Sequence, residues 1–274
     1  MARAIAVDDS GIYFSTNTDP GNVGSFLRAP LAGGTAVALG SGSIFAIVVN
    51  DAAVFTLDGG GQILRWAKSG GPPVTLVSGS RFLPAVQIAD AFGYLYWTTD
   101  DADFIQIFRR PDDGSGATAR IGAMAGSGPI AFDSTHLWQS TTHGIFRSAP
   151  DGSGQTRAIT SPNGDTFGPL AVDDAHVFVG TVPGRLWAAD SRVGATLTLI
   201  ASTSGSAVEL LADGGRLYVR DSMASRSRIT RYAADGSGAT VLADRAGGIG
   251  GMAIHGGFLY YTSTDDSTVY RVCK

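Results

Sequence analysis

The sequence contains a single cysteine, a single glutamate and two lysines, and each shortage excludes a class of protein. One cysteine, Cys273, cannot close an internal disulfide or build a multi-thiolate metal site. We expect a free terminal thiol there; the alternative is half of a disulfide whose partner lies outside this chain. The other 23 acidic residues are aspartates, which favour turns, whereas glutamate favours helices. The composition therefore predicts strands and turns, and it excludes coiled coils and long helical bundles.

Charge and long apolar runs are also scarce. Charged residues are only 16% of the 274 residues, and the formal net charge is −4. Nucleic-acid-binding domains carry a basic face, so this charge argues against a nucleic-acid partner. No apolar run approaches the roughly 18 residues that span a bilayer, so no membrane span is expected. Met1 leads directly into a strand-like run without a signal peptide, which indicates either a cytosolic protein or a trimmed leader.

What the sequence does contain is a repeat of about 41 residues. In each copy an apolar run ends in a polar, usually acidic turn, and an apolar run with an aromatic residue follows. The aromatic residues stand 40 to 42 residues apart, at Tyr13, Phe55, Tyr96, Trp138, Phe178, Tyr218 and Tyr260. A residue that every copy repeats is usually structural, so we expect these aromatic residues in the core.

A third run follows in each copy and carries arginine at one position in six of the seven. These arginines are Arg28, Arg65, Arg109, Arg147, Arg231 and Arg271. Ala188 takes that position in the fifth copy. We expect the arginine column to hydrogen-bond between repeats or to turn carbonyls. Turns such as Asp235-Gly236-Ser237-Gly238 often follow, and Asp-Gly between short apolar runs favours hairpins.

Four strands in about 41 residues is the size of one propeller blade. The sequence thus predicts an all-β fold, a seven-bladed β-propeller of four-stranded blades in one domain over residues 1–274. The blades are expected to start near residues 4, 45, 86, 129, 169, 208 and 251. The last blade, as predicted, has only three strands. Its open edge suggests a homo-oligomer or a fourth strand from a segment absent here.

One blade carries a recognisable motif. Leu95-Tyr96-Trp97-Thr98-Thr99-Asp100 resembles the Tyr-Trp-Thr-Asp signature of the YWTD propeller repeats of lipoprotein receptors, and Leu259–Asp265 is a weaker copy. YWTD domains have six blades, so the seven copies here are more similar to bacterial propellers built from degenerate repeats of this type, many of them secreted. The resemblance implies fold rather than function. It favours an extracellular or periplasmic location.

Positions that break the repeat are the candidate functional residues, because loops on a rigid scaffold often carry function. Asp100, Asp101 and Asp103 form the densest acidic loop. Three carboxylates so close together could hold Ca²⁺, which prefers hard oxygen ligands, although the EF-hand spacing is absent. The alternative is a set of solvated turn residues.

Two further residues suggest chemistry. Glu209 opens the first strand of the sixth copy, and His143 lies in a loop of the fourth. If both met at the mouth of the propeller, they could act as a general acid and base. A metal-assisted lyase or hydrolase is therefore one hypothesis. Catalytic motifs such as Gly-x-Ser-x-Gly and His-Glu-x-x-His are absent, and the alternative is a hydrogen-bonded glutamate with a solvated histidine.

The favoured hypothesis is a binding propeller that presents its loops to a protein, peptide or glycan. Phe82 and Phe167 precede prolines in connections between blades and could form an apolar rim, or else pack beneath the loops. Arg185 and Arg220 are the candidate polar contacts on the same face. A purely structural or assembly module is the remaining alternative.

Overall fold

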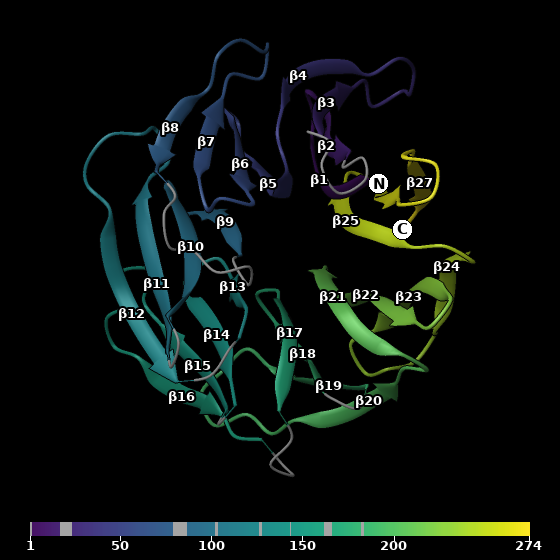
Figure 1. Ribbon diagram of the computed structural model, residues 1–274. Helices are drawn as coiled ribbons and strands as arrows, with labels where there is room; N and C mark the ends of the chain where they lie inside the picture. The colour runs from purple at the N-terminus through teal and green to yellow at the C-terminus, as the bar shows by residue number, and fades with distance from the viewer. Residues whose placement is uncertain are drawn as a thin grey trace. The chain divides into compact units, whose positions relative to one another are not determined.

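The computed structural model describes residues 2–16, 24–78, 87–101, 104–125, 128–142, 144–161, 166–181 and 184–274. These residues form seven antiparallel sheets, six of four strands and a last one of three (Figure 1). The fold is therefore all-β, a seven-bladed β-propeller with a three-stranded last blade, as the repeat predicts. Within the described ranges no helix is present that is long and apolar enough to cross a membrane.

The sheets are named blades one to seven in chain order. The chain divides into two compact units. Unit one comprises Met1–Thr99, Arg109–Ala119 and Gly247–Lys274, and unit two comprises Asp100–Phe108 and Arg120–Ala246. Blades one, two and seven belong to unit one, and blades four, five and six to unit two. Residues of blade three occur in both. Every blade begins within two residues of its predicted start.

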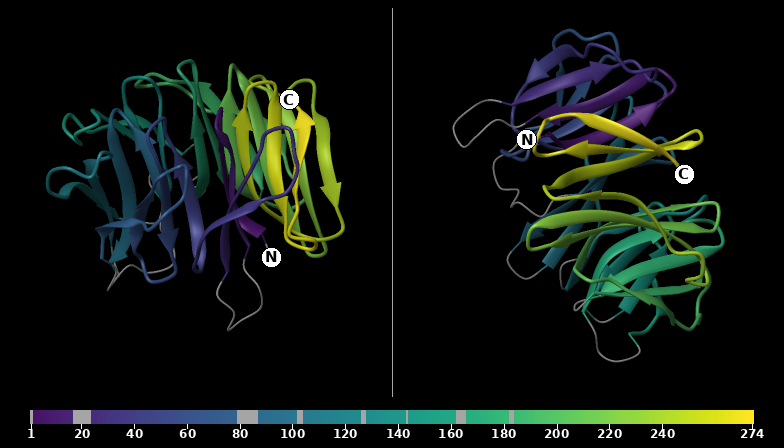
Figure 2. Two further views of the ribbon diagram at one scale, coloured as in Figure 1. Left: turned by 90° about the horizontal axis from the view of Figure 1, so that it is seen from above. Right: turned by 90° about the vertical axis from the view of Figure 1, so that its right-hand side faces the viewer.

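Blade one contains β1 (Ala2–Asp8), β2 (Gly11–Thr16), β3 (Ser25–Ala29) and β4 (Val37–Ser41), and blade two contains β5 (Ile44–Val49), β6 (Val54–Asp58), β7 (Ile63–Trp66) and β8 (Val74–Val77). Blade seven contains β25 (Ile249–His255), β26 (Phe258–Ser263) and β27 (Val269–Cys273). Within unit one, β1 lies between β25 and β5, and Figure 2 shows blade seven beside blade one.

Blade three contains β9 (Ile88–Ala91), β10 (Tyr94–Asp101), β11 (Phe104–Pro111) and β12 (Ala119–Ala125). Blade four contains β13 (Ile130–Phe132), β14 (Leu137–Thr141), β15 (Gly144–Ser148) and β16 (Thr156–Ile159), and blade five contains β17 (Phe167–Val172), β18 (His176–Thr181), β19 (Arg185–Asp190) and β20 (Thr198–Ser202). Blade six contains β21 (Ser206–Asp213), β22 (Arg216–Met223), β23 (Arg226–Ala233) and β24 (Thr240–Arg245). Within unit two, β17 packs between β13 and β21.

The repeated aromatic residues form the core of the blades. All seven are at most 2% exposed. Burying one such ring removes roughly 150–250 Å² from water, which stabilises the fold by several kcal/mol each at about 25 cal/mol per Å². The core prediction is confirmed.

The arginine column lies directly across from these rings. The cross-strand partners are Tyr13 and Arg28, Phe55 and Arg65, Trp138 and Arg147, Tyr218 and Arg231, and Tyr260 and Arg271. The guanidinium carbon of Arg28 is 5.9 Å from the Tyr13 ring centroid, and its nitrogens donate to the carbonyls of Ser10 and, in the next blade, Lys68. Arg271 donates to the Leu31 carbonyl of blade one. The predicted structural role is thus confirmed for these two arginines.

The aspartates that end the first strands close the following turns. Asp133 Oδ1 accepts hydrogen bonds from the backbone N–H groups of Thr135 and His136, and its Oδ2 accepts one from the buried Trp138 indole at 2.6 Å. Asp173 caps the turn at His176 in the same way and also accepts the Gly215 N–H of the next blade at 2.9 Å. Asp133 therefore holds its own turn and the Trp138 indole, whereas Asp173 holds both its turn and the neighbouring blade.

Blade two has Asn50 at this position, and blade three has Asp90. Asn50 Nδ2 donates to Asp90 Oδ2 at 3.1 Å and to Asp112 Oδ2 at 2.9 Å, so one amide holds two carboxyl groups. Burial and the charge of Asp112 raise the pKa of Asp90 to about 6. The native state thus binds this proton more tightly than the unfolded chain does.

Replacing Asp90 with asparagine should consequently stabilise the protein at neutral pH. The stabilising contribution of the Asp90 proton is complete below the unfolded pKa of about 4 and is lost as pH rises through about 6. We expect Asp90→Asn to gain about 1 kcal/mol over wild type near pH 7, after discounting for partial solvent exposure, and much less near pH 4. Urea unfolding at both pH values measures the difference, with Asp113→Asn as the exposed control. If Asp90→Asn is no more stable than wild type near pH 7, the prediction is wrong.

Candidate functional site

Blade six is longer than its neighbour at the end where the second and third strands meet. In blade five the paired strands end at Thr181 and Arg185. The equivalent pair in blade six is Asp221 and Arg228, and pairing continues through two more positions to Met223 and Arg226. Ala224 and Ser225 alone form the loop, as in a tight hairpin. The extension adds a polar ribbon that the repeat itself does not require.

Charged side chains gather on this extension. We call Asp221, Arg226, Arg228 and Asp244, which share one face of the sheet, the blade-six charged surface; the Glu209–Arg220 pair lies on the other face. Arg220 Nε lies 2.9 Å from Glu209 Oε2 across β21 and β22. Asp244 receives both Arg226, at 2.8 Å, and Arg228, at 3.3 Å. Arg226 is the most accessible of the three arginines, with half of its side-chain surface exposed.

Asp221 is the unusual member of this surface. It is only 4% exposed, and among the described residues no hydrogen bond reaches its Oδ1. Burial raises its pKa, against the opposing charge of Arg228, its cross-strand neighbour. The equivalent positions of the other six blades hold Thr16, Asp58, Thr99, Thr141, Thr181 and Ser263. The aspartate of blade two, Asp58, is only partly buried and accepts the N–H groups of its own turn, unlike Asp221. A buried carboxylate is costly and the repeat does not need it, so this position is a candidate for function.

The site residues predicted from the sequence differ from one another in their surroundings. Glu209 is ion-paired with Arg220, so these two predicted site residues are brought together. Arg185, partly buried, opens β19 at the corresponding end of blade five. Phe167 is 2% exposed and belongs to a core cluster with Trp138 and Trp187, so it packs inside the protein, which is the alternative that the sequence left open.

The remaining candidates lie outside the described residues. They are Phe82, His143 and Asp103, together with the side chains of Asp100 and Asp101 at the end of β10. Within the part of the chain that is described, no group of three or more histidine, cysteine, aspartate or glutamate side chains is arranged to hold a metal ion. The calcium and acid–base hypotheses therefore stay predictions.

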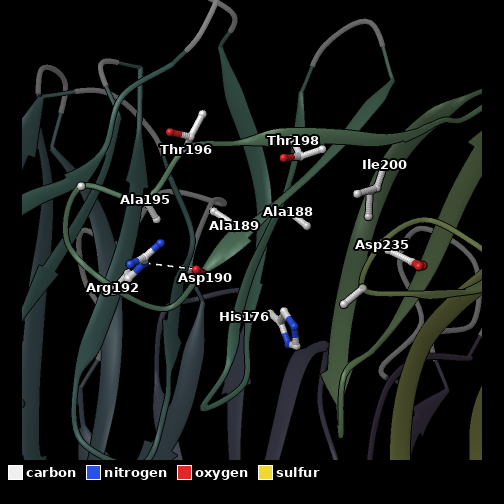
Figure 3. A pocket seen from close by; sticks show the side chains of 12 residues that line it. His176, Ala188, Ala189, Asp190, Arg192, Ala195, Thr196, Thr198, Ile200 and Asp235 are labelled. Atoms are coloured by element: carbon white, nitrogen blue, oxygen red, sulfur yellow. Dashed lines mark ion pairs between the residues drawn. The ribbon is translucent and has the colours of Figure 1, made fainter.

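A pocket of about 520 Å³ lies at the opposite end of blades five and six (Figure 3). Its lining includes His176, Ala188, Asp190, Ala234 and Asp235, and on one side Arg192 pairs with Asp190 at 3.1 Å. Sequence reasoning did not place a site here. The signal was present, however, because Ala188 is the one interruption of the arginine column.

The comparisons with known proteins support the fold. The sequence matches no known family model, and no curated protein matches it significantly. The computationally designed Ika8 protein superposes on the whole chain and on 96% of its own length, with a TM-score of 0.62 at 12% identity. A chain from a nidogen/laminin complex covers 89% of this protein and is itself covered over 79%, with a TM-score of 0.50 at 15% identity. At these identities the likeness establishes the propeller fold alone.

Proposed function

We propose that this protein is a binding propeller that holds a partner polypeptide against the blade-six charged surface. The observation that carries the proposal is the extended β22–β23 hairpin, which combines a buried carboxylate, Asp221, with two accessible arginines. Arginine and methionine are enriched in protein interfaces, and Met223 and Arg226 face each other next to the tip.

The partner segment that fits best is acidic. Arg226 and Arg228 both bind Asp244, and Asp221 faces Arg228, so the charges of these four residues balance. The half-exposed guanidinium of Arg226 nevertheless has further N–H donors that can bind a carboxylate of the partner. A further acid from the partner would complete this arrangement as a bidentate contact.

A polypeptide ligand is favoured over the other hypotheses. The glycan hypothesis depended on an aromatic rim at Phe82 and Phe167, and Phe167 lies in the core. The catalytic hypothesis needed Glu209 available to a substrate, whereas its Oε2 is bound by Arg220.

Selection of peptides from a displayed random library on the purified protein tests the proposal. We expect the selected peptides to be rich in aspartate and glutamate. Their affinity should fall about tenfold or more, or roughly 1.4 kcal/mol, in the variant Arg226→Gln/Arg228→Gln. It should also weaken as salt is raised.

Arg192→Gln is the matched control, because Arg192 is likewise an exposed arginine paired with an aspartate but lies at the other end of blade five. It should leave the affinity unchanged. Peptides without acidic enrichment, or equal binding by the double variant, would refute the proposal.

A further inference from the structure

The pocket of blades five and six lies where the repeated arginine is missing. In blade one, Arg28 covers the ring of Tyr13 and reaches the carbonyls of Ser10 and Lys68. In blade five the cross-strand partner of Phe178 is Ala188. A methyl group leaves open most of the volume that the arginine side chain fills elsewhere, and Ala188 is part of the pocket wall.

A second cation is missing from the same groove. Lys68 of blade two pairs with Asp8 of blade one. Ala234 stands at the repeat position of Lys68 in blade six, and it also lines the pocket. Asp173, the counterpart of Asp8, instead receives the Gly215 N–H and lies 3.2 Å from His176 Nδ1. The groove has therefore lost both positive side chains that blades one and two contribute to theirs.

The negative side chains of the groove are retained. Asp235 belongs to the same kind of turn as Asp113, and each accepts the N–H of the serine two residues later, Ser237 and Ser115. The pKa of Asp113 is lowered first by Ser115 and further by the charges of Arg65 and Arg110. The pKa of Asp235 is lowered by Ser237, with no arginine among the groups that act on it. Asp235 borders the pocket beside Ala188, which stands at the column position that Arg65 occupies in the blade before Asp113.

We propose that this pocket binds the guanidinium group of an arginine side chain supplied by a partner polypeptide. The ligand replaces the side chain that Ala188 lacks. Asp235 provides a charge-assisted acceptor, and His176 provides a flat surface beside the group. The volume of about 520 Å³ is within the range of roughly 300–1,000 Å³ for small-ligand sites, so it accommodates the side chain and its flanking backbone.

Arg192 does not already fill the pocket. Its side chain is 74% exposed, and it is held by Asp190, which is itself 62% exposed. The pair therefore lies at the solvent-exposed edge. The site is also separate from the blade-six charged surface, because the Asp235 turn and the β22–β23 hairpin are at opposite ends of β23.

Calorimetric titration with N-acetyl-arginine N-methylamide tests the proposal. We expect a dissociation constant of about 1 mM or lower. The neutral citrulline analogue should bind about tenfold more weakly, because it has the same shape without the charge. Asp235→Asn should cost a similar factor. Asp113→Asn is the control, because it changes the equivalent turn of blade three, next to a blade in which Arg65 occupies the arginine position. This variant should bind the arginine ligand as wild type does.

Ala188→Arg provides a second and opposite readout. The new side chain should occupy the pocket, abolish arginine binding and raise the melting temperature by about 2–4 °C. Should this variant fail to fold, the citrulline and Asp235→Asn titrations decide the matter alone. Equal binding of the citrulline analogue, unchanged binding by Asp235→Asn, or no arginine binding by wild type would each overturn the proposal.

Discussion

Gly236→Ala is expected to lower the free energy of unfolding by about 3 kcal/mol or more, which for a chain of this size lowers the melting temperature by about 10 °C. Gly236 has a φ of +83°, and a Cβ there would stand 2.2 Å from the Ile200 carbonyl oxygen of blade five. The neighbouring atom is backbone in a paired strand, so it cannot move aside as a flexible side chain would. Thermal or urea unfolding measures the loss.

Gly238 is the matched control for this substitution. It lies in the same turn with a φ of +62°, but a Cβ would meet nothing within 4 Å. Gly238→Ala should therefore cost only about 1 kcal/mol, the penalty of a left-handed backbone on its own. Equal losses for the two variants would mean that blades five and six are not in close contact at Ile200. The repeat makes the same prediction at Gly152, where the Ile121 carbonyl would be 2.0 Å away.

Asp133→Ala should cost about 3 kcal/mol as well, for an electrostatic reason. The substitution removes the acceptor of the Trp138 indole N–H, which is fully buried, and of two backbone N–H groups in the turn. Burial by itself would raise the pKa of Asp133, but the hydrogen bonds from Trp138, Thr135 and His136 outweigh it and lower the pKa. The stabilisation is consequently present above about pH 4 and is lost as pH falls through the lowered native pKa.

Asp151→Ala is the control, because Asp151 is exposed and accepts hydrogen bonds from Ser153 within its own turn. Its cost should stay below about 1 kcal/mol. Chemical unfolding of both variants near pH 7 and near pH 3 separates the effects. The wild-type advantage over Asp133→Ala should shrink at the lower pH. An advantage that persists undiminished would show that packing, rather than the carboxylate, explains the loss.

Asp133 and Asp90 show how much of the protein could be predicted from its repeats. Both occupy one repeat position, and the sequence marks both as turn residues. The pKa of Asp133 is lowered because its carboxyl accepts several hydrogen bonds. The pKa of Asp90 is raised because its carboxyl is buried beside that of Asp112. Asp112 lies in the turn that follows β11 of the same sheet, and no pattern within the turn after Asp90 specifies its approach.

The candidate sites show the same limit. Glu209 and Arg220 were chosen separately, and cross-strand register makes them an ion pair. Phe167 was a candidate contact because it precedes a proline in a connection, yet it packs with Trp138 and Trp187. The sequence shows that Ala188 interrupts the arginine column, but it does not show that a pocket results. The pocket forms because Ala188 and Ala234, on the two sides of one groove, stand at positions where blades one and two have an arginine and a lysine.

By itself, the sequence determined the all-β fold, the seven blades, the buried aromatic column and the turn aspartates. These features follow from residue spacing and local backbone preference, and both recur in each of the seven copies of the repeat. Only the tertiary structure decided which departures from the repeat matter. Strand pairing and the packing of adjacent blades bring distant residues together, so that Asp221 is buried across from Arg228 and Ala188 opens a pocket beside blade six. Such effects depend on pairs of distant residues, and periodicity along one chain does not encode them.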